Sequence, residues 1–333
     1  MAKFVAFMTD VYLPRARPTP SFAGFAAGPD LYATIVRANT GLSASPEQIH
    51  EIALREVRRG RDDIEHIAQA LGFEGSVDAF METVRQDQRC APLDEAAATE
   101  QFRVITEQVE KRLPSLFGTI PRTPYVLKPM ASLPPGASVG QARSGSSKDG
   151  RPGQVLVLMP VSSRCGFVNM MLHEGFPGHL LQMHIADESS DISEARKRLS
   201  YSAFVEGWAE YAITLGDDLG VVADPYVRVA RANGRLREAI RAALETGVQV
   251  KGWTRQVALD FYSQSAPWVV RANMETEVNR ASDQPGRRLA YMVGRMKFME
   301  LRAFAEKELG SPIRCPAVPR RNPPARRATA AGA

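Results

Sequence analysis

The sequence predicts a mainly α-helical protein with at most a small β element, and three observations lead to that prediction. Apolar residues recur at helical spacing over most of the chain, between recognisable helix starts and stops. Only one run, residues 153–161, has the valines and the flanking glycine and proline that favour a strand. The hydrophobic content of 44% over 333 residues is ordinary for a globular protein and sufficient for a core.

The N-terminal part of the chain is expected to be a helical scaffold, residues 1–130. Its first 44 residues mix proline, glycine and aromatic residues without periodicity, which predicts an irregular segment that ends in a short helix. The first clear helix follows, because Ser45 can cap it, Pro46 suits the first helical position and Gln48 completes a capping box. The helices predicted here cover residues 30–37, 45–71, 76–88 and 94–113, and Pro114 is expected to end the last of them.

A loop rich in glycine, serine and proline is expected over residues 131–153, followed by a metal-site helical region of the same catalytic domain, residues 154–310. This second region begins with the strand candidate and continues in helices. They are predicted from about Cys165, over 199–215, from Asp224-Pro225 to Gly247, from the Thr254 cap, over 268–281 and over 287–309. Residues 311–333 are Pro-, Arg- and Ala-rich without periodicity and are predicted to be a disordered tail.

Composition excludes several classes of protein. The net charge of +5 comes from five arginines in the last 23 residues, and the remaining 37 basic residues equal the 37 acidic ones. The body is therefore neutral and gives no reason to expect nucleic acid as a partner. The cysteines at 90, 165 and 315 form no C-x-x-C pair, which argues against a disulfide framework and favours buried thiols in a reducing, cytoplasmic setting. No run is long enough to span a membrane.

Chemistry concentrates in residues 171–182, where two of the five histidines flank a carboxylate: His173, Glu174 and His179. Imidazoles are common zinc ligands, and a carboxylate between them can act as a general base. The histidines are six residues apart instead of the four of H-E-x-x-H, so a regular helix would turn them about 120° away from each other. Both reach one metal only if the helix breaks, and Pro177-Gly178 is the expected break.

A third ligand is expected from residues 204–212, where Glu206 and Glu210 share one face of an otherwise apolar and aromatic helix. A carboxylate drawn into such a setting needs a partner, and a metal is one. Two histidines, one glutamate and an open position make a catalytic zinc set. No ligand or catalytic role is expected for the remaining polar residues. We expect solvated helix faces for His50, His66, Glu275 and Glu277, and surface or structural ion pairs for Arg295 and Arg302.

Residues 173–182, H-E-G-F-P-G-H-L-L-Q, together with 205–211, V-E-G-W-A-E-Y, resemble the bacterial family catalogued as domain of unknown function 885. That family is usually placed near the gluzincin metallopeptidases, such as the thimet oligopeptidase and Taq carboxypeptidase groups. The resemblance runs from about residue 10 to 310 and includes Tyr12-Leu13-Pro14, Ser162-Ser163-Arg164, Lys251-Gly252-Trp253 and Tyr291-Met292-Val293-Gly294 in family order.

The resemblance implies a zincin-like helical fold in which His173, His179 and Glu206 hold Zn²⁺ and Glu174 is the catalytic base. It also implies that Tyr291 is a catalytic phenol that stabilises an oxyanion. Glu210, Gln182 and His184 are expected around the ligands, with Glu210 bonded to a ligating imidazole. The expected substrate is a peptide or a small amide, and the oligomeric state stays open.

Three departures from the family keep alternatives open. Family members are usually longer ahead of residue 1, so this chain is expected to be an N-terminally shortened member that lacks a wall of the cleft and any leader. Gln249 stands where relatives often carry a histidine, and the tail does not resemble the family's ending. An inactive helical binding module is therefore the main alternative to a zinc hydrolase. A non-haem iron oxygenase is the other, because two histidines and one carboxylate also describe its iron site.

Overall fold

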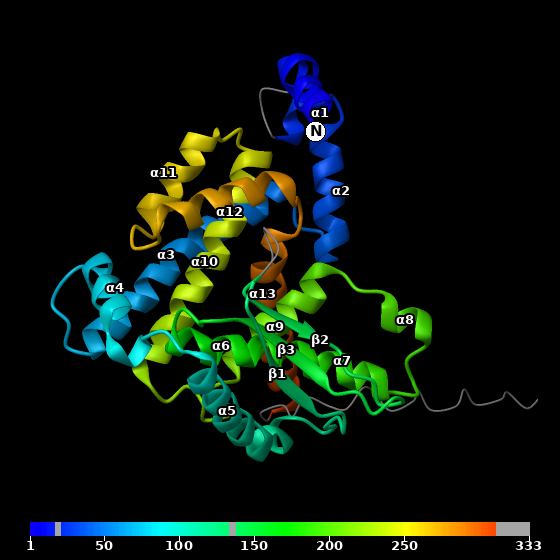
Figure 1. The fold of residues 1–333 in the computed structure, drawn as a ribbon, viewed down its shortest axis with the longest axis vertical. Helices are drawn as coiled ribbons and strands as arrows, with labels where there is room; N and C mark the ends of the chain where they lie inside the picture. The colour runs from blue at the N-terminus through cyan, green and yellow to red at the C-terminus, as the bar shows by residue number, and fades with distance from the viewer. Residues whose placement is uncertain (17–20, 133–137, 311–333) are drawn as a thin grey trace, which may run out of the picture.

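A computed structural model describes residues 1–16, 21–132 and 138–310, and the tail prediction for 311–333 lies outside the described residues. The protein is mainly α-helical with one small sheet, as predicted (Figure 1). The α-helices are α1 (Ala2–Phe7), α2 (Gly28–Thr40), α3 (Pro46–Ala70), α4 (Val77–Gln86), α5 (Glu95–Leu116), α6 (Arg164–Glu174), α7 (His179–Glu188), α8 (Glu194–Arg198), α9 (Ser202–Thr214), α10 (Pro225–Gln249), α11 (Arg255–Ser265), α12 (Arg271–Asp283) and α13 (Arg288–Leu309).

Helix starts follow the local cap signals. Ser45 accepts a hydrogen bond from the Gln48 amide while the Gln48 side chain accepts one from the Ser45 amide, so the predicted capping box is present. The side chains of residues 76, 94, 224 and 254 likewise cap α4, α5, α10 and α11. Each of these N-cap residues has an extended backbone conformation, as Ser45 does. Pro114 does not end its helix, contrary to the prediction, because α5 continues through it to Leu116.

The sheet has three strands in the order β1-β3-β2, namely β1 (Tyr125–Met130), β2 (Gly140–Arg143) and β3 (Gly153–Leu158). The predicted strand is β3, which lies in the centre, parallel to β1 and antiparallel to β2. The expectation of loop throughout 131–153 is therefore wrong at β2. Because both edges of β3 are already paired, β3 cannot take up a peptide by strand addition, and the edge strands are β1 and β2.

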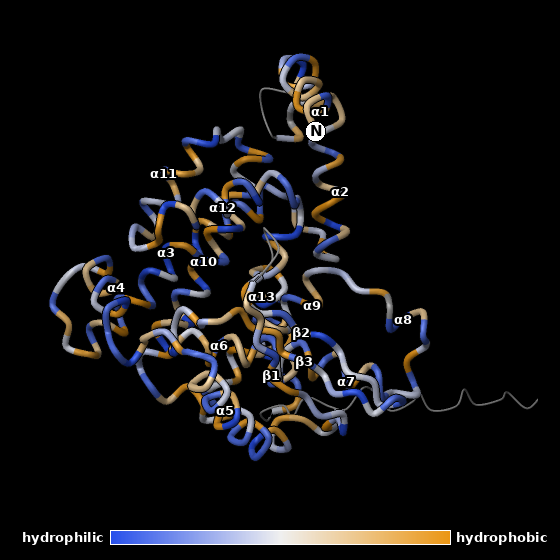
Figure 2. The backbone as a smooth tube through the Cα atoms, viewed as in Figure 1, coloured by the Kyte–Doolittle hydropathy of each residue, from blue (hydrophilic) through white to orange (hydrophobic). Residues whose placement is uncertain are grey.

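The sheet contacts α5, α6 and α7, and the long helices pack closely on one another. α3 runs along α10, and α9 crosses α13 with backbone contact, because a Cβ built on Gly207 would lie 2.4 Å from the Cα of Gly294. Only glycine at both positions allows that approach. The peripheral helices alternate between hydrophobic and hydrophilic residues along the tube, as amphipathic helices do (Figure 2). No helix in the described part of the chain is both long and apolar enough to cross a membrane.

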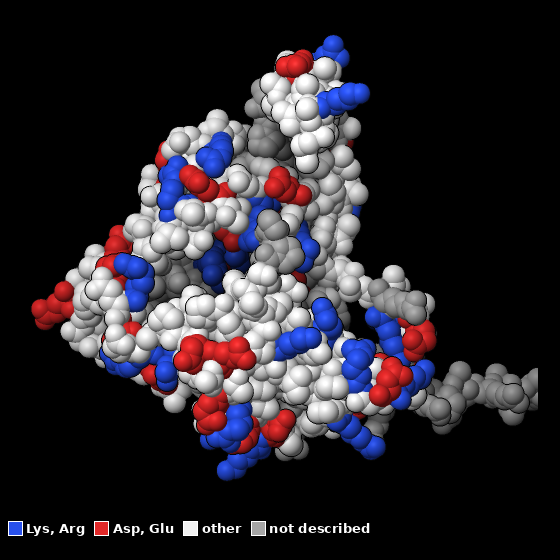
Figure 3. Space-filling model, viewed as in Figure 1, with Lys and Arg blue, Asp and Glu red and all other residues white. Residues whose placement is uncertain are grey.

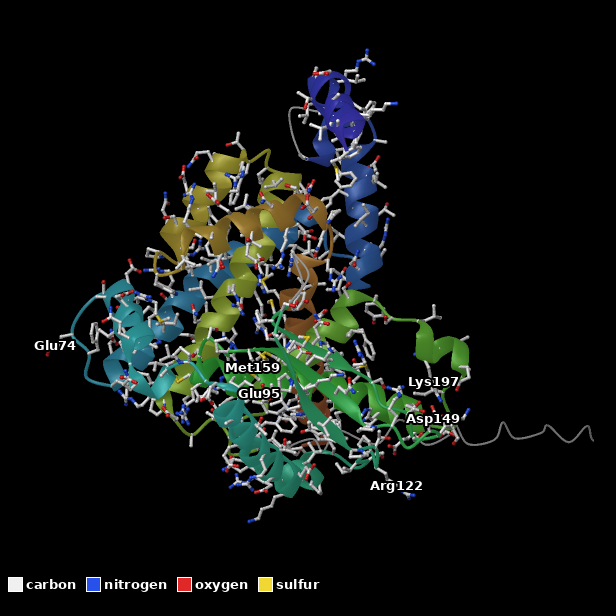
Figure 4. All side chains as sticks on the ribbon, in the orientation of Figure 1. Glu74, Glu95, Arg122, Asp149, Met159 and Lys197 are labelled. Carbon is white, nitrogen blue, oxygen red and sulfur yellow. A yellow bond between two sulfur atoms is a disulfide. The ribbon has the colours of Figure 1, made fainter. Side chains whose placement is uncertain are left out.

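The first 44 residues contain more helix than predicted. α1 and a short π-helix over Met8–Tyr12 precede α2, which extends beyond the expected 30–37 at both ends. α1 exposes apolar side chains such as Phe4 and Phe7 and stands apart from the rest of the molecule (Figure 1). Glu74, at the turn between α3 and α4, marks the left edge of the molecule in the same view (Figure 4).

Cys90 and Cys165 form a disulfide, which corrects the prediction of separate buried thiols. Cys90 ends a 3-10 turn (Gln88–Cys90) and Cys165 lies in the first turn of α6, so the bond ties the helical scaffold to the helix that carries His173 and Glu174. Their separation of 75 residues in the sequence hid the pairing, because only the fold brings them together.

A buried carboxylate, Glu245 of α10, holds the start of α13. It accepts hydrogen bonds from the amides of Gly286 and Arg288 and from the hydroxyl of Tyr32 in α2. α13 has no side-chain cap of its own, so Glu245 replaces one from a different helix. Burial raises the pKa of Glu245 to about 7, although the hydrogen bonds from Gly286, Tyr32 and Arg288 oppose that rise.

Reduction of the disulfide is expected to lower the free energy of unfolding by about 2–4 kcal/mol, since the bond restricts the unfolded chain over a long loop. Urea unfolding with and without a thiol reductant measures this difference. The Cys90→Ser variant is the control, because its stability should not respond to reductant. Equal stability of the unaltered chain in both conditions would contradict the stabilising role of this bond.

Glu245 is expected to make stability fall as pH rises from about 4.5 to about 7. Between these pH values Glu245 stays protonated in the folded state but loses its proton in the unfolded state. The stabilisation is therefore complete below about pH 4.5 and is lost as the pH rises through the folded pKa of about 7. The full effect is about 3 kcal/mol. Unfolding curves of the unaltered chain and of Glu245→Gln, compared over this pH range, should differ by an amount that changes with pH. A constant difference would show that Glu245 keeps an ordinary pKa.

Candidate metal centre

The two histidines of the motif come together because the helix breaks between them. α6 ends at Glu174 and α7 begins at His179, with Pro177-Gly178 in the connection, as predicted from the spacing. The rings of His173 and His179 lie 4.7 Å apart between centroids and meet at 87°. A Cβ at Gly178 would lie 1.9 Å from the carbonyl oxygen of His173, so only glycine permits the chain to turn back this tightly.

Trp208 of α9 secures the break from outside. Its indole Nε1 donates to the carbonyl oxygen of Pro177 at 3.0 Å, with Gly178 O at 3.3 Å. The Pro177 carbonyl lies between the two helices and would otherwise need another donor, whereas the Gly178 carbonyl also accepts from the Gln182 amide. The sequence shows Trp208 only as part of the family motif and does not indicate what it contacts. A tryptophan within such a motif is nevertheless a signal for a structural role.

Glu206 reaches the same point from α9. Its Oε2 lies 3.3 Å from His179 Nε2 and 3.7 Å from His173 Nε2. Zinc bonds to nitrogen and oxygen of about 2.0–2.1 Å in a tetrahedron separate neighbouring ligand atoms by roughly 3.3–3.4 Å. Both distances from Glu206 are therefore close to the spacing of ligands on one small cation.

Glu174 lies at the same centre, since a carboxylate oxygen of Glu174 and one ring nitrogen from each of His173 and His179 lie within 4.8 Å of one another. Either carboxylate could thus complete a set with the two histidines. The distances of 3.3 and 3.7 Å suit Glu206 as the third ligand, and Glu174 is buried beside the two histidines.

The centre carries more carboxylates than imidazoles. Burial lowers the pKa of His173, but Glu210, Glu206 and Glu174 outweigh burial and raise it well above its usual range. Burial raises the pKa of Glu206, but hydrogen bonds with His173 and His179 outweigh burial and lower it. A cation at this position would replace the protons that the carboxylates draw onto the imidazoles.

Behind His173, a chain of buried groups holds the ring in place. Glu210 lies 3.1 Å from His173 Nδ1, which leaves Nε2 directed to the centre. Burial and Glu210 raise the pKa of Glu238 in α10 well above its usual range, and the two carboxyl groups share a hydrogen bond. Arg295 of α13 approaches Glu238 at 3.4 Å, a structural ion pair as expected for this arginine. Carboxylates bonded to the far nitrogen of a ligating imidazole are typical of zinc sites.

Tyr291 faces the centre from α13. Its ring stacks on His173 with 6.5 Å between centroids and an interplanar angle of 8°. Burial and Glu206 raise the pKa of the Tyr291 phenol, and its hydroxyl donates a hydrogen bond to the Glu206 carboxylate. The glycine contact between α9 and α13 places these two side chains beside each other.

Two residues expected around the ligands, Gln182 and His184, form hydrogen bonds with other groups. Gln182 donates to the backbone oxygen of Phe204 at 3.3 Å. His184 is fully buried beneath the sheet, where its Nε2 accepts from the amide of Gly145 at 3.1 Å and its ring meets Phe176. Neither of these contacts involves a ligand histidine. Beyond His184, the end of α7 forms hydrogen bonds with the segments near Arg122 and Asp149 and with Lys197 of α8 (Figure 4).

Two solvated-face predictions are wrong. His50 is buried, and its Nδ1 lies 2.8 Å from the hydroxyl of Thr246. Glu277 is buried and bonded by Arg241. Both residues face α10, which their own helical periodicity does not reveal. Gln249 uses its whole amide in the fold, since it accepts from the Phe22 amide and donates to the oxygen of Ala281.

Comparisons with known proteins place the fold. The family described as "Bacterial protein of unknown function (DUF885)" matches residues 1–315. A crystal structure described as a putative lipoprotein from Colwellia psychrerythraea is 26% identical, with a TM-score of 0.83 over 92% of this chain and 54% of that one. A putative lipoprotein of unknown function from Shewanella oneidensis is 19% identical, with a TM-score of 0.70 over 94% and 58%. The chain thus spans little more than half the length of these proteins. No curated protein matches it.

Gly178→Ala is expected to destabilise the fold by at least about 2 kcal/mol, because the new methyl group would overlap the backbone of α6. It should also separate the two imidazoles and lower the zinc content of the purified protein. Urea unfolding and metal analysis by mass spectrometry measure both effects. Gly234→Ala in α10, where a Cβ meets nothing within 4 Å, is the matched control and should be neutral or stabilising. Full zinc binding by Gly178→Ala would show that the tight turn does not set the site.

Proposed function

The chain belongs to the DUF885 family of bacterial proteins, whose function is unknown, and we propose that it is a zinc-dependent hydrolase, most specifically a metallopeptidase. The observation that carries the proposal is the approach of His173, His179 and Glu206 to the spacing of zinc ligands, with a second buried carboxylate, Glu174, beside them. A purely structural site has no use for that extra carboxylate, whereas hydrolysis needs a base.

The residues present fit zinc. The donor set is two imidazoles and one carboxylate, the Glu210 carboxylate backs His173, and the surplus of negative charge favours a cation. When bound, zinc would supply a Lewis acid and would lower the pKa of water at the centre to about 7. The adjacent base and the helical setting favour this reading over an iron oxygenase, which has no need of such a base.

Glu174 transfers the proton, and Tyr291 stabilises the negative charge that develops on the substrate. Glu174 accepts a proton from the attacking water and returns it to the leaving amine nitrogen, so that the carboxyl group ends the cycle ionised. The Tyr291 phenol exchanges its hydrogen bond to Glu206 for one to the carbonyl oxygen that gains negative charge. The raised pKa keeps this phenol protonated and able to donate at neutral pH.

The edge of the sheet nearest Glu174 supports a peptide as the substrate. Among the described residues β2 pairs with β3 alone, and a Cβ on its first residue, Gly140, would lie 3.4 Å from a Glu174 oxygen. An extended peptide that adds to this edge would pass by the base.

An oxidising compartment suits this protein better than the cytoplasm. The Cys90–Cys165 bond persists where thiols are not kept reduced. The two similar solved proteins are described as putative lipoproteins, a class held at membrane surfaces. We therefore place the proposed activity outside the cytoplasm, in contrast to the expectation from the cysteine count.

Glu174→Gln is expected to lower the rate of peptide hydrolysis by about 10²–10⁴-fold while the protein keeps one zinc per chain, because the base is lost and the ligands are not. A peptide-library screen read by mass spectrometry, with zinc content measured in parallel, tests this. His173→Ala and Glu206→Ala should lose both zinc and activity.

The matched control is Glu275→Gln, an acid on α12 that pairs only with Arg271 of the same helix among its described ion pairs. It should keep zinc and full activity. Near-normal rates in Glu174→Gln would refute the mechanism. A folded, metal-free chain without activity would favour the binding-module alternative.

A further inference from the structure

Four arginines gather around one carboxylate where α10, α12 and α13 meet. Glu277 of α12 accepts two hydrogen bonds from Arg241, at 2.6 and 2.9 Å, and one from Arg280 at 3.2 Å. Arg237 lies one turn before Arg241 on the same face of α10, and Arg288 begins α13. We call Arg237, Arg241, Arg280 and Arg288 the arginine cluster. Its four positive charges face a single directly bonded carboxylate.

Two members of the arginine cluster lack the partners that such groups normally have. The side chain of Arg288 is 8% exposed, and its buried Nε has no hydrogen-bond partner among the described residues. A buried guanidinium nitrogen without an acceptor is costly, which points to a missing ligand. Arg237 makes no ion pair within the described part of the chain.

The cluster reaches solvent at Arg237. Arg237 is exposed, and the neighbouring Arg241, together with desolvation, lowers the pKa of its guanidinium. Figure 3 shows Lys and Arg side chains gathered in a hollow of this face, over α10 and below α12. A low-dielectric concave wall with one sign of charge concentrates ligands of the opposite sign.

The arginine cluster adjoins the candidate metal centre. Arg288 is three residues before Tyr291, so both lie on one face of α13, and Tyr291 stacks on His173. Arg287 reaches within 3.9 Å of Glu206. One helical turn rises about 5.4 Å, and an extended peptide advances about 3.4 Å per residue. An anion held here would therefore lie only a few residues from a bond cleaved beside Tyr291.

We infer that the arginine cluster is a subsite for a carboxylate of a peptide ligand, supplied either by its free C-terminus or by an acidic side chain near that end. Arginines bind carboxylates through paired N–H donors, and Arg288 Nε with the exposed Arg237 offers donors that the fold does not use. The inference rests on the proposed function in taking a peptide as the ligand. It adds that short, acid-ended peptides are preferred over long or neutral ones.

The test is calorimetric binding to zinc-loaded protein in the Glu174→Gln background, where peptides stay intact. The probes are Ala-Phe-Ala with a free C-terminus, the same peptide as its C-terminal amide, and amidated Ala-Phe-Glu. The free acid is expected to bind at least about tenfold more tightly than the amide, as a charge-assisted hydrogen bond predicts. Tight binding of amidated Ala-Phe-Glu as well would assign the subsite to acidic side chains, and its weak binding would assign it to the C-terminus.

Arg237→Gln and Arg288→Gln should each reduce the preference for the acid to about threefold or less. Arg58→Gln is the matched control, because Arg58 is an exposed arginine of α3 for which the described residues form no ion pair. If Arg288→Gln fails to fold by circular dichroism, the exposed Arg237 alone decides. Equal binding of acid and amide, no binding of either, or a preference that survives in Arg237→Gln would overturn the subsite.

The outcome separates this inference from the proposed function. An acid preference that depends on Arg237, in a protein that cleaves no peptide with Glu174 restored, would support the subsite and reject the peptidase. Hydrolysis that treats acids and amides alike would do the reverse.

Discussion

The tight turn between α6 and α7 is the constraint on which the candidate centre depends. Six residues separate the two histidines, and a regular helix would direct them apart. Gly178 lies against the carbonyl of His173 so closely that no side chain fits, and this contact brings His179 back beside the first imidazole. Trp208 donates a hydrogen bond to the Pro177 carbonyl in the turn, from the same helix that carries Glu206. One local interruption thus sets the positions of three side chains.

Local signals explain what the sequence predicted well. Caps at Ser45 and Thr254 and the break at Pro177-Gly178 act over a few residues, so they can be recognised without the fold. The helical class and the convergence of His173, His179 and Glu206 followed from such signals. The approach of Glu210 to His173 also matches the sequence expectation, because shared helix faces are readable from spacing.

Long-range packing explains what the sequence did not reveal. The Cys90–Cys165 bond, the burial of His50 against α10 and the pairing of Glu277 with Arg241 all join distant parts of the chain. Strand β2 is only four residues long and lies in a stretch whose composition favours a loop. Glu238 reaches Glu210 only because α10 passes behind α9, which no periodicity within either helix indicates.

The backbone contact at Gly207 and Gly294 has a consequence for motion. Where Gly207 meets Gly294 no side chain separates α9 from α13, so sliding or tilting of one helix on the other would produce a backbone clash, and we expect the two to move as one rigid body. Glu206 lies on α9 and Tyr291 on α13, so the distance between their side chains should stay constant when neighbouring elements move. Any motion that admits a ligand to the centre must then come from elements that pack less closely. The ligand would meet the Tyr291 phenol and the Glu206 carboxylate at a spacing that is already set.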